Sequence, residues 1–384
     1  MAHLKQAARC GSMLLLFLTG CFVASARQRQ ASDNRPREVT PRWERVYWEL
    51  GGAALRSVFS APVQSGGASS PRWLWVGDEK GFLRLAAFNP DSQSPLGPQP
   101  SPASPLQYFG LSKLEVMAPA AADARARGAS VNAIYFDEQG DGYLLKGNRL
   151  YFSSNAGFGW SQLFEVPNLP DGTPATLFSI AITGRGACMV GMFSQPDDVK
   201  ESLVYCTDRR PAEKGARWER VRVGPQKTQL FHVFFRGDKR GWIVGTQGTI
   251  LRTTNYGKDW EQVEFESKSL RQSYFVSESD GWIVGLSGTL LRTSDAGAHW
   301  DLVTLPFGGQ LANISLRSIK FSADGRFGWI VGDQGTILYS DDAGENWRIL
   351  PPPAKDIRLE ALFVDDYFCW AVGGGSNVWR QRLK

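Results

Sequence analysis

The sequence has few of the residues that build metal sites and nucleophilic sites. Its 384 residues include 5 Cys and 3 His. Cys188, Cys206 and Cys369 are the cysteines that follow the N-terminal stretch, and none has the CxxC or His/Cys spacing of a zinc site. The HExxH, GxSxG and phosphate-loop motifs are also missing. We therefore expect no metal, no cofactor and no catalytic residues.

Three cysteines cannot all form disulfides with one another. We expect Cys188 and Cys206 to be two buried thiols. The alternative is a bridge between neighbouring strands, formed in an oxidising compartment.

The sequence also has a small net charge and few long apolar stretches. The net charge is +5 and no cluster of Lys and Arg occurs, which does not indicate nucleic-acid binding. Beyond the first 26 residues no stretch approaches the ~18 apolar residues that a membrane-spanning helix needs. Of the 43 basic residues 13 are Lys and 30 are Arg, a bias that favours planar, bidentate contact with carboxylate or phosphate.

The N-terminus reads as a targeting segment. A positive stretch precedes a short apolar core that begins at Met13. Leu18-Thr19-Gly20-Cys21 then resembles a bacterial lipobox, in which the Cys21 thiol is acylated after cleavage. Cleavage after Ala26 and an uncleaved anchor are the alternatives. We expect a signal peptide at 1–26, a flexible tether at 27–40 and an exported, extracytoplasmic domain held to the membrane by its lipid.

The rest of the chain is built from repeats. Gly241-Trp242-Ile243-Val244-Gly245 returns at Gly281–Gly285 and at Gly328–Gly332, in steps of 40 and 47 residues. Such periods indicate an array of similar supersecondary units. Each unit reads as four strands: an alternating first strand, the Gly-Trp-Ile-Val-Gly strand, a third strand, and a fourth that starts at a Trp. Seven stretches fit the first strand: Leu55–Phe59, Val131–Phe136, Leu177–Ile182, Leu230–Phe235, Leu270–Phe275, Leu316–Phe321 and Leu359–Val364.

A ring explains the two ends of the array. The last unit stops at its third strand, whereas the Trp43 segment is a spare fourth strand before the first unit. We therefore expect residues 41–384 to form one all-β, seven-bladed β-propeller of four-stranded antiparallel blades, closed by the N-terminal strand beside the C-terminal blade. Pro- and Ser-rich insertions at about 62–71 and 89–122 read as flexible surface loops of the first blade.

A turn motif, Ser/Thr-x-Asp/Asn-x-Gly-x-x-Trp, occurs four times. Its Asp or Asn is expected to accept backbone N–H groups two residues on, its Gly to take positive φ, and its Trp to pack beneath the turn. This is the Asp-box (BNR) repeat, which acts as a structural staple. The motif residues are Asn155, Gly157 and Trp160; Asn255, Gly257 and Trp260; Asp295, Gly297 and Trp300; and Asp342, Gly344 and Trp347.

The Gly-Trp-Ile-Val-Gly strand, the Gly-Thr-Ile-Leu strand and the Asp-box together resemble the photosystem II stability/assembly factor family. The likeness is strong over 228–380 and weaker over 42–227. It implies a non-enzymatic propeller of the periplasm or thylakoid lumen that binds a membrane-protein subunit or peptide segment during assembly. It also implies an Arg-rich binding surface. We expect a monomer.

Three arginines share one position, directly after the leading Leu of a first strand: Arg56, Arg271 and Arg317. They predict a clamp for an anion or an acidic peptide near the centre of the ring. Gln247, Asp333 and Gln334, in loops between second and third strands, are expected on the same face. The alternative is a set of solvated arginines or of salt bridges between blades.

A sialidase-like glycoside hydrolase or a glycan-binding propeller is the alternative function, because the Asp-box scaffold hosts both. The sequence lacks the Arg-Ile-Pro segment of sialidases. His232 and His299, the histidines of the mature chain, read as core or surface residues.

Overall fold

The computed structural model describes residues 42–47, 53–62, 72–80, 83–88 and 129–383, apart from 138–139, 158, 196–197, 225 and 267. The predicted signal peptide at 1–26 with Cys21, the tether at 27–40 and the insertion at 89–122 lie outside these residues, as does nearly all of the insertion at 62–71. Within the described ranges, no helix is long and apolar enough to cross a membrane.

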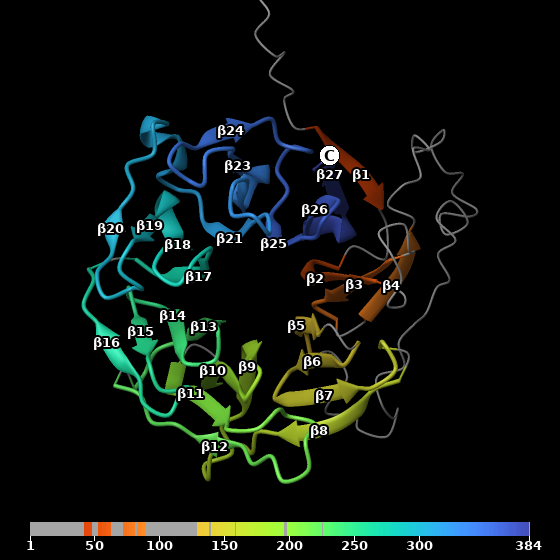
Figure 1. Ribbon diagram of the computed structural model, residues 1–384, viewed down its shortest axis with the longest axis vertical. Helices are drawn as coiled ribbons and strands as arrows, with labels where there is room; N and C mark the ends of the chain where they lie inside the picture. Colours follow the sequence, from red (N-terminus) through yellow and green to blue (C-terminus); the bar gives the residue numbers. More distant parts are fainter. Residues whose placement is uncertain are drawn as a thin grey trace, which may run out of the picture. The chain divides into compact units, whose positions relative to one another are not determined.

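The described chain is an all-β propeller of antiparallel sheets, which we call blades (Figure 1). Six blades have four strands. In chain order, five of them are β5(Val131–Phe136) β6(Gly142–Lys146) β7(Arg149–Ser153) β8(Ser161–Glu165); β9(Ala175–Ile182) β10(Ala187–Gln195) β11(Asp198–Thr207) β12(Glu219–Arg220); β13(Leu230–Arg236) β14(Arg240–Gly245) β15(Ile250–Thr253) β16(Glu261–Val263); β17(Leu270–Phe275) β18(Gly281–Gly285) β19(Leu290–Thr293) β20(Asp301–Leu302); and β21(Leu316–Phe321) β22(Gly328–Gly332) β23(Ile337–Ser340) β24(Arg348–Leu350).

The sixth four-stranded blade joins the two ends of the described chain. It holds β25(Leu359–Val364), β26(Phe368–Gly373) and β27(Val378–Arg382), and β1(Trp43–Tyr47) pairs antiparallel with β27. Four 3-10 turns lie between strands: η3(Leu286–Gly288), η4(Gly308–Leu311), η5(Asp333–Gly335) and η6(Gly374–Ser376).

The remaining sheet has three strands, β2(Leu55–Pro62), β3(Arg72–Asp78) and β4(Leu83–Phe88). Six sheets therefore have the predicted four strands, whereas the described residues of this sheet supply three; the chain that follows Phe88 lies outside the described ranges.

The innermost strands hold the arrangement together. We call β2, β5, β9, β13, β17, β21 and β25 the inner strands; each contacts the next, and β25 contacts β2. The strand beside each inner strand is almost entirely buried, as in β14, β18 and β22. The apolar cores therefore lie between neighbouring blades, for example where Trp242 of β14 stacks on Phe275 of β17 with 3.6 Å between ring centroids.

The inner strands are sheet edges, so their outer N–H groups need partners. Side chains from the preceding blade supply them. The N–H of Ser273 donates to His232 Nδ1, that of Ile319 to Gln272 Oε1 and that of Leu362 to Ser318 Oγ. The N–H of Val233 donates to Ser179 Oγ in the same way. We call this set of hydrogen bonds the belt.

The Asp-box turns form as predicted in part. Gly157, Gly257, Gly297 and Gly344 all have positive φ, between 74° and 88°. The acceptor geometry differs, because the Asp or Asn oxygen accepts the N–H four residues on, from Gly159, Asp259, His299 and Asn346. The N–H two residues on, that of the Gly, donates instead to the Ser or Thr that opens the motif.

Each Asp-box glycine also packs against the preceding blade. An added Cβ at Gly297 would lie 2.3 Å from Trp242, one at Gly344 2.8 Å from Trp282 and one at Gly157 2.5 Å from Trp75. Gly257 instead lies against the sulfurs of Cys188 and Cys206.

These two cysteines form a disulfide, so the prediction of two buried thiols is wrong. They face each other across β10 and β11 with Cα atoms 4.1 Å apart, a geometry that brings the sulfurs together. Cys188 occupies the position of the Gly-Trp-Ile-Val-Gly tryptophan. The disulfide thus replaces a tryptophan beneath the next Asp-box turn.

Replacing both Cys188 and Cys206 with Ala should lower the free energy of unfolding by about 2–4 kcal/mol, because the cross-link restricts the unfolded chain. Urea unfolding followed by tryptophan fluorescence measures this. A reducing agent should destabilise the native sequence by a similar amount and leave the double variant unchanged. Equal stability of the native protein with and without reductant would contradict the bridge.

Candidate functional site

A register break marks the same place in every inner strand. The residue after the leading Leu or Val has no partner on the second strand, which makes it a β-bulge. Bulges bend a strand and re-aim one side chain. We call these seven residues the rim. In order around the ring they are Arg56, Asn132, Phe178, Phe231, Arg271, Arg317 and Glu360.

The last glycine of the Gly-Trp-Ile-Val-Gly strand permits the bulge. An added Cβ at Gly245 would lie 2.3 Å from the carbonyl oxygen of Gln229, and one at Gly332 would lie 2.3 Å from that of Ser315. At these two positions a larger residue would push the inner strand away. Two other blades bulge in the same way with Lys146 or Asp78 opposite the leading residue.

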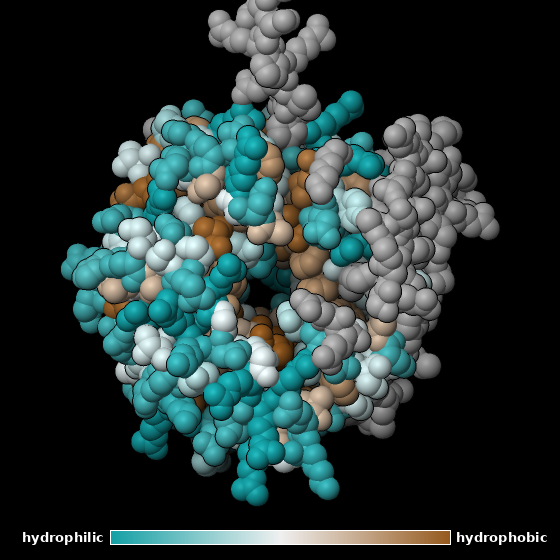
Figure 2. Space-filling model, in the orientation of Figure 1, coloured by the Kyte–Doolittle hydropathy of each residue, from teal (hydrophilic) through white to brown (hydrophobic). Residues whose placement is uncertain are grey.

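Neighbouring rim residues touch one another. Arg56 and Arg317 both pair with Glu360, Arg271 covers Phe231, and Phe231 lies beside Phe178. Figure 2 shows an opening at the centre of the ring, with both hydrophilic and hydrophobic surface at its edge.

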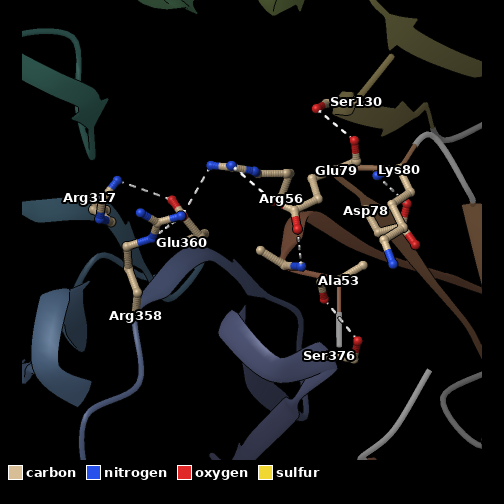
Figure 3. A network of polar contacts seen from close by, with 11 residues as sticks. Ala53, Arg56, Asp78, Glu79, Lys80, Ser130, Arg317, Arg358, Glu360 and Ser376 are labelled. Carbon is tan, nitrogen blue, oxygen red and sulfur yellow. Dashed lines mark hydrogen bonds and ion pairs between the residues drawn. The ribbon is translucent and has the colours of Figure 1, made fainter. Parts of the chain in front are cut away.

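One part of the rim is an ion-pair network, seen in Figure 3. Glu360 accepts from Arg56 at 3.1 Å, from Arg317 at 3.2 Å and from Arg358 at 2.5 Å. Its side chain is only 8% exposed. Three guanidinium groups around one carboxylate fix each other's orientation.

Two further carboxylates complete the network. Glu79 lies 3.3 Å from Arg56, and Asp333 lies 2.7 Å from Arg317. The N–H of Ala54, together with Arg56, holds the pKa of Glu79 below its usual value, whereas burial acts against that shift. With Arg271 and Arg358 included, four arginines face three carboxylates, so the rim keeps a positive charge.

Arg271 differs from the other rim arginines. Its guanidinium lies 4.3 Å from the centre of the Phe231 ring, and its buried Nε has no hydrogen-bond partner among the described residues. Burial, and then the charge of Arg317, lowers its pKa. Burying a cation without a hydrogen-bonded counterion costs free energy. An anionic ligand at Arg271 would recover part of that cost.

The structure brings Arg56, Arg317 and Asp333 into one network. The alternative prediction, that these arginines form salt bridges between blades, applies to Arg56 and Arg317 but not to Arg271. Gln247 and Gln334 are exposed, each with a φ of 57°, and neither bonds to a rim arginine within the described residues.

Sequence reasoning missed Phe178, Phe231 and Glu360. All three directly follow a leading Leu, at the position of the arginines. Comparing that position across all seven first strands, and not only among arginines, would have identified them.

The two histidines have structural roles. His232 belongs to the belt, and burial lowers its pKa to about 3, so its imidazole is neutral. His299 is exposed in an Asp-box turn, 2.6 Å from Asp295. No group of three or more His, Cys, Asp or Glu in the described part of the chain could hold a metal ion.

Comparison with known sequences points to one family. A family model described as "Photosynthesis system II assembly factor YCF48" matches residues 210–277 and 262–355. The chloroplastic photosystem II stability/assembly factor HCF136 of Cyanidioschyzon merolae is 38% identical over 55 residues. This match covers 14% of the chain and 12% of that relative's length.

Solved structures share the fold. "YCF48 bound to D1 peptide" is 14% identical, with a TM-score of 0.58 over 89% of this chain and 97% of that chain. YCF48 from Cyanidioschyzon merolae is 14% identical, with a TM-score of 0.59 over 88% and 98%. A virginiamycin B lyase from Staphylococcus aureus is 10% identical, with a TM-score of 0.62 over 89% and 99%. The predicted resemblance to photosystem II assembly factors is confirmed.

Glu360→Gln should lower the free energy of unfolding by about 1–3 kcal/mol, because three guanidinium groups lose their shared carboxylate; the partial exposure of Arg56 and Arg358 keeps the loss below that of a fully buried pair. Glu345→Gln is the control, since Glu345 pairs with Arg292 but is 58% exposed. Chemical denaturation measures both variants. Equal stability of the two would contradict a central role for Glu360.

Proposed function

We propose that this chain, a photosystem II assembly factor-like β-propeller, acts as a non-catalytic monomer that binds an acidic peptide segment of a membrane protein at its rim. The observation that carries this proposal is Arg271, a half-buried guanidinium whose Nε lacks a partner in the described structure.

The surrounding network prepares the rim for such a ligand. Glu360 holds Arg56 and Arg317 in place, so these side chains lose little freedom when a ligand binds. Arg271 lies near them, and its Nε has no hydrogen-bond partner in the described part of the chain. A guanidinium can bind a carboxylate through two parallel hydrogen bonds. The net positive charge of the rim also attracts acidic segments over several ångströms.

The comparisons support a peptide as the ligand class. One structural neighbour is YCF48 bound to D1 peptide, a complex of that protein. At 14% identity the likeness carries the fold, so the ligand of the present chain is inferred from its own rim.

We also propose that the three-stranded sheet β2-β3-β4 acts as the seventh blade of a closed ring. Its inner strand β2 contacts β25 on one side and β5 on the other. Arg56 of β2 then belongs to the same rim as Arg317.

We further propose that the chain is exported and tethered to the membrane through lipid on Cys21. The lipobox-like Leu18-Thr19-Gly20-Cys21 supports this proposal. The Cys188–Cys206 disulfide supports it as well, because such bridges persist mainly in oxidising compartments. A rim held near a membrane surface would meet loops and termini of membrane proteins.

Arg271→Ala should weaken binding of an acidic peptide about tenfold or more, since a charge-assisted hydrogen bond contributes about 1.5–3 kcal/mol. Calorimetric titration measures this, with a peptide in which Gln replaces each acidic residue as the ligand control. Arg240→Ala is the protein control, because Arg240 is 42% exposed and pairs with Glu278 away from the rim. Unchanged affinity for the Arg271 variant would refute the proposed site.

Cys21→Ser should release the protein from the membrane fraction, because serine cannot carry the thioether-linked lipid. Detergent partitioning and metabolic labelling with a fatty acid measure the change. Labelling that persists in the Cys21→Ser variant would contradict the tether.

A further inference from the structure

We propose that the rim recognises two features of its peptide together, a carboxylate and a large apolar side chain two residues away. This inference rests on the proposed function and concerns its specificity. It comes from the part of the rim that carries no charge.

Phe178 and Phe231 form that uncharged part. Their ring centroids lie 5.8 Å apart with the ring planes tilted by 51°. Both side chains are only partly buried, whereas the preceding Leu177 and Leu230 are fully buried. The buried leucines anchor the inner strands β9 and β13, and the bulges release the two phenylalanines from the sheet register.

Charge and apolar surface meet at Phe231. Arg271 covers one side of the Phe231 ring at 4.3 Å, and Phe178 lies on another side. The arginine whose Nε lacks a partner is thus in contact with an aromatic pair. A carboxylate bound to Arg271 would place the neighbouring residues of its peptide over Phe231 and Phe178.

The dimensions set the spacing of the two features. The two contacts, 4.3 Å and 5.8 Å, place Phe178 no more than about 10 Å from the Arg271 guanidinium. An extended peptide advances about 3.3 Å per residue and places side chains i and i+2 on the same face, so a spacing of two residues fits within that distance. The acidic and the apolar side chain can then reach both contacts without a bend.

Other parts of the rim do not offer this pairing. Next to Phe178 is Asn132, whose amide donates to the carbonyl oxygen of Leu177 at 2.7 Å. Beyond Asn132 the ion-pair network of Arg56 and Glu360 begins. Within the rim, a guanidinium whose Nε has no hydrogen-bond partner among the described residues and an apolar surface meet where β17 adjoins β13.

The test uses three fluorescein-labelled twelve-residue peptides in a Gly/Ser background. The first has one Glu and one Phe two positions apart, the second has the same residues eight positions apart, and the third has Glu alone. We expect the first to bind the native protein about tenfold more tightly than the other two, the gain from burying one large apolar side chain. Fluorescence anisotropy measures the affinities, up to millimolar protein.

Phe178→Ala and Phe178→Leu test the protein side. The Ala variant should reduce the affinity for the first peptide to that for the third, and the Leu variant should retain most of the advantage. Leu302→Ala is the matched control, because Leu302 is 63% exposed and lies on β20. Unfolding curves establish that the variants are folded, and the Leu variant keeps the test valid if the Ala variant is unstable.

The outcomes separate the two proposals. Equal affinity of the native protein for all three peptides, with dependence on Arg271, overturns the apolar contact and leaves the proposed function intact. An advantage for the first peptide that survives Phe178→Ala also overturns it. Peptide binding that does not depend on Arg271, or no binding at millimolar protein, overturns both.

Discussion

The exposed edges of the inner strands are the constraint on which the other features depend. A strand at the centre of a ring has no further strand to pair with, and its backbone groups still need partners. In the belt, side chains from the neighbouring blade, such as Gln272 and Ser318, accept hydrogen bonds from the backbone N–H groups of the inner strands. β25 and β2 are joined by the side-chain ion pair of Arg56 with Glu360. Blades are therefore joined by polar contacts at the centre and by apolar packing farther out.

The rim follows from the same geometry. Because each inner strand bulges directly after its leading residue, one side chain per blade is released from the sheet register. That side chain has no role in strand pairing, so its identity is not set by the sheet. The bulge recurs in all seven inner strands, whereas the residue at the bulge is arginine, glutamate, phenylalanine or asparagine. Function can change there while the scaffold stays the same.

The sequence predicts what is local and periodic. The Gly-Trp-Ile-Val-Gly strands, the positive φ of Gly257 and the shared position of Arg56, Arg271 and Arg317 all follow from spacing. Contacts between blades were harder to predict, since they depend on how the ring brings distant segments together. Glu360 pairs with arginines of β2 and β21, and it was missed because these segments are far from it in the sequence. The Cys188–Cys206 disulfide joins two strands of one blade; it was the alternative to two buried thiols, and only the register of β10 and β11 decides between them.

The disulfide beneath Gly257 makes one joint between blades chemically different from the corresponding joints that rest on Trp75, Trp242 and Trp282. A buried tryptophan contributes packing energy whatever the redox conditions. A disulfide contributes only after two electrons have been removed from its thiols, so the strength of this one joint depends on the redox potential around the protein as well as on temperature and denaturant.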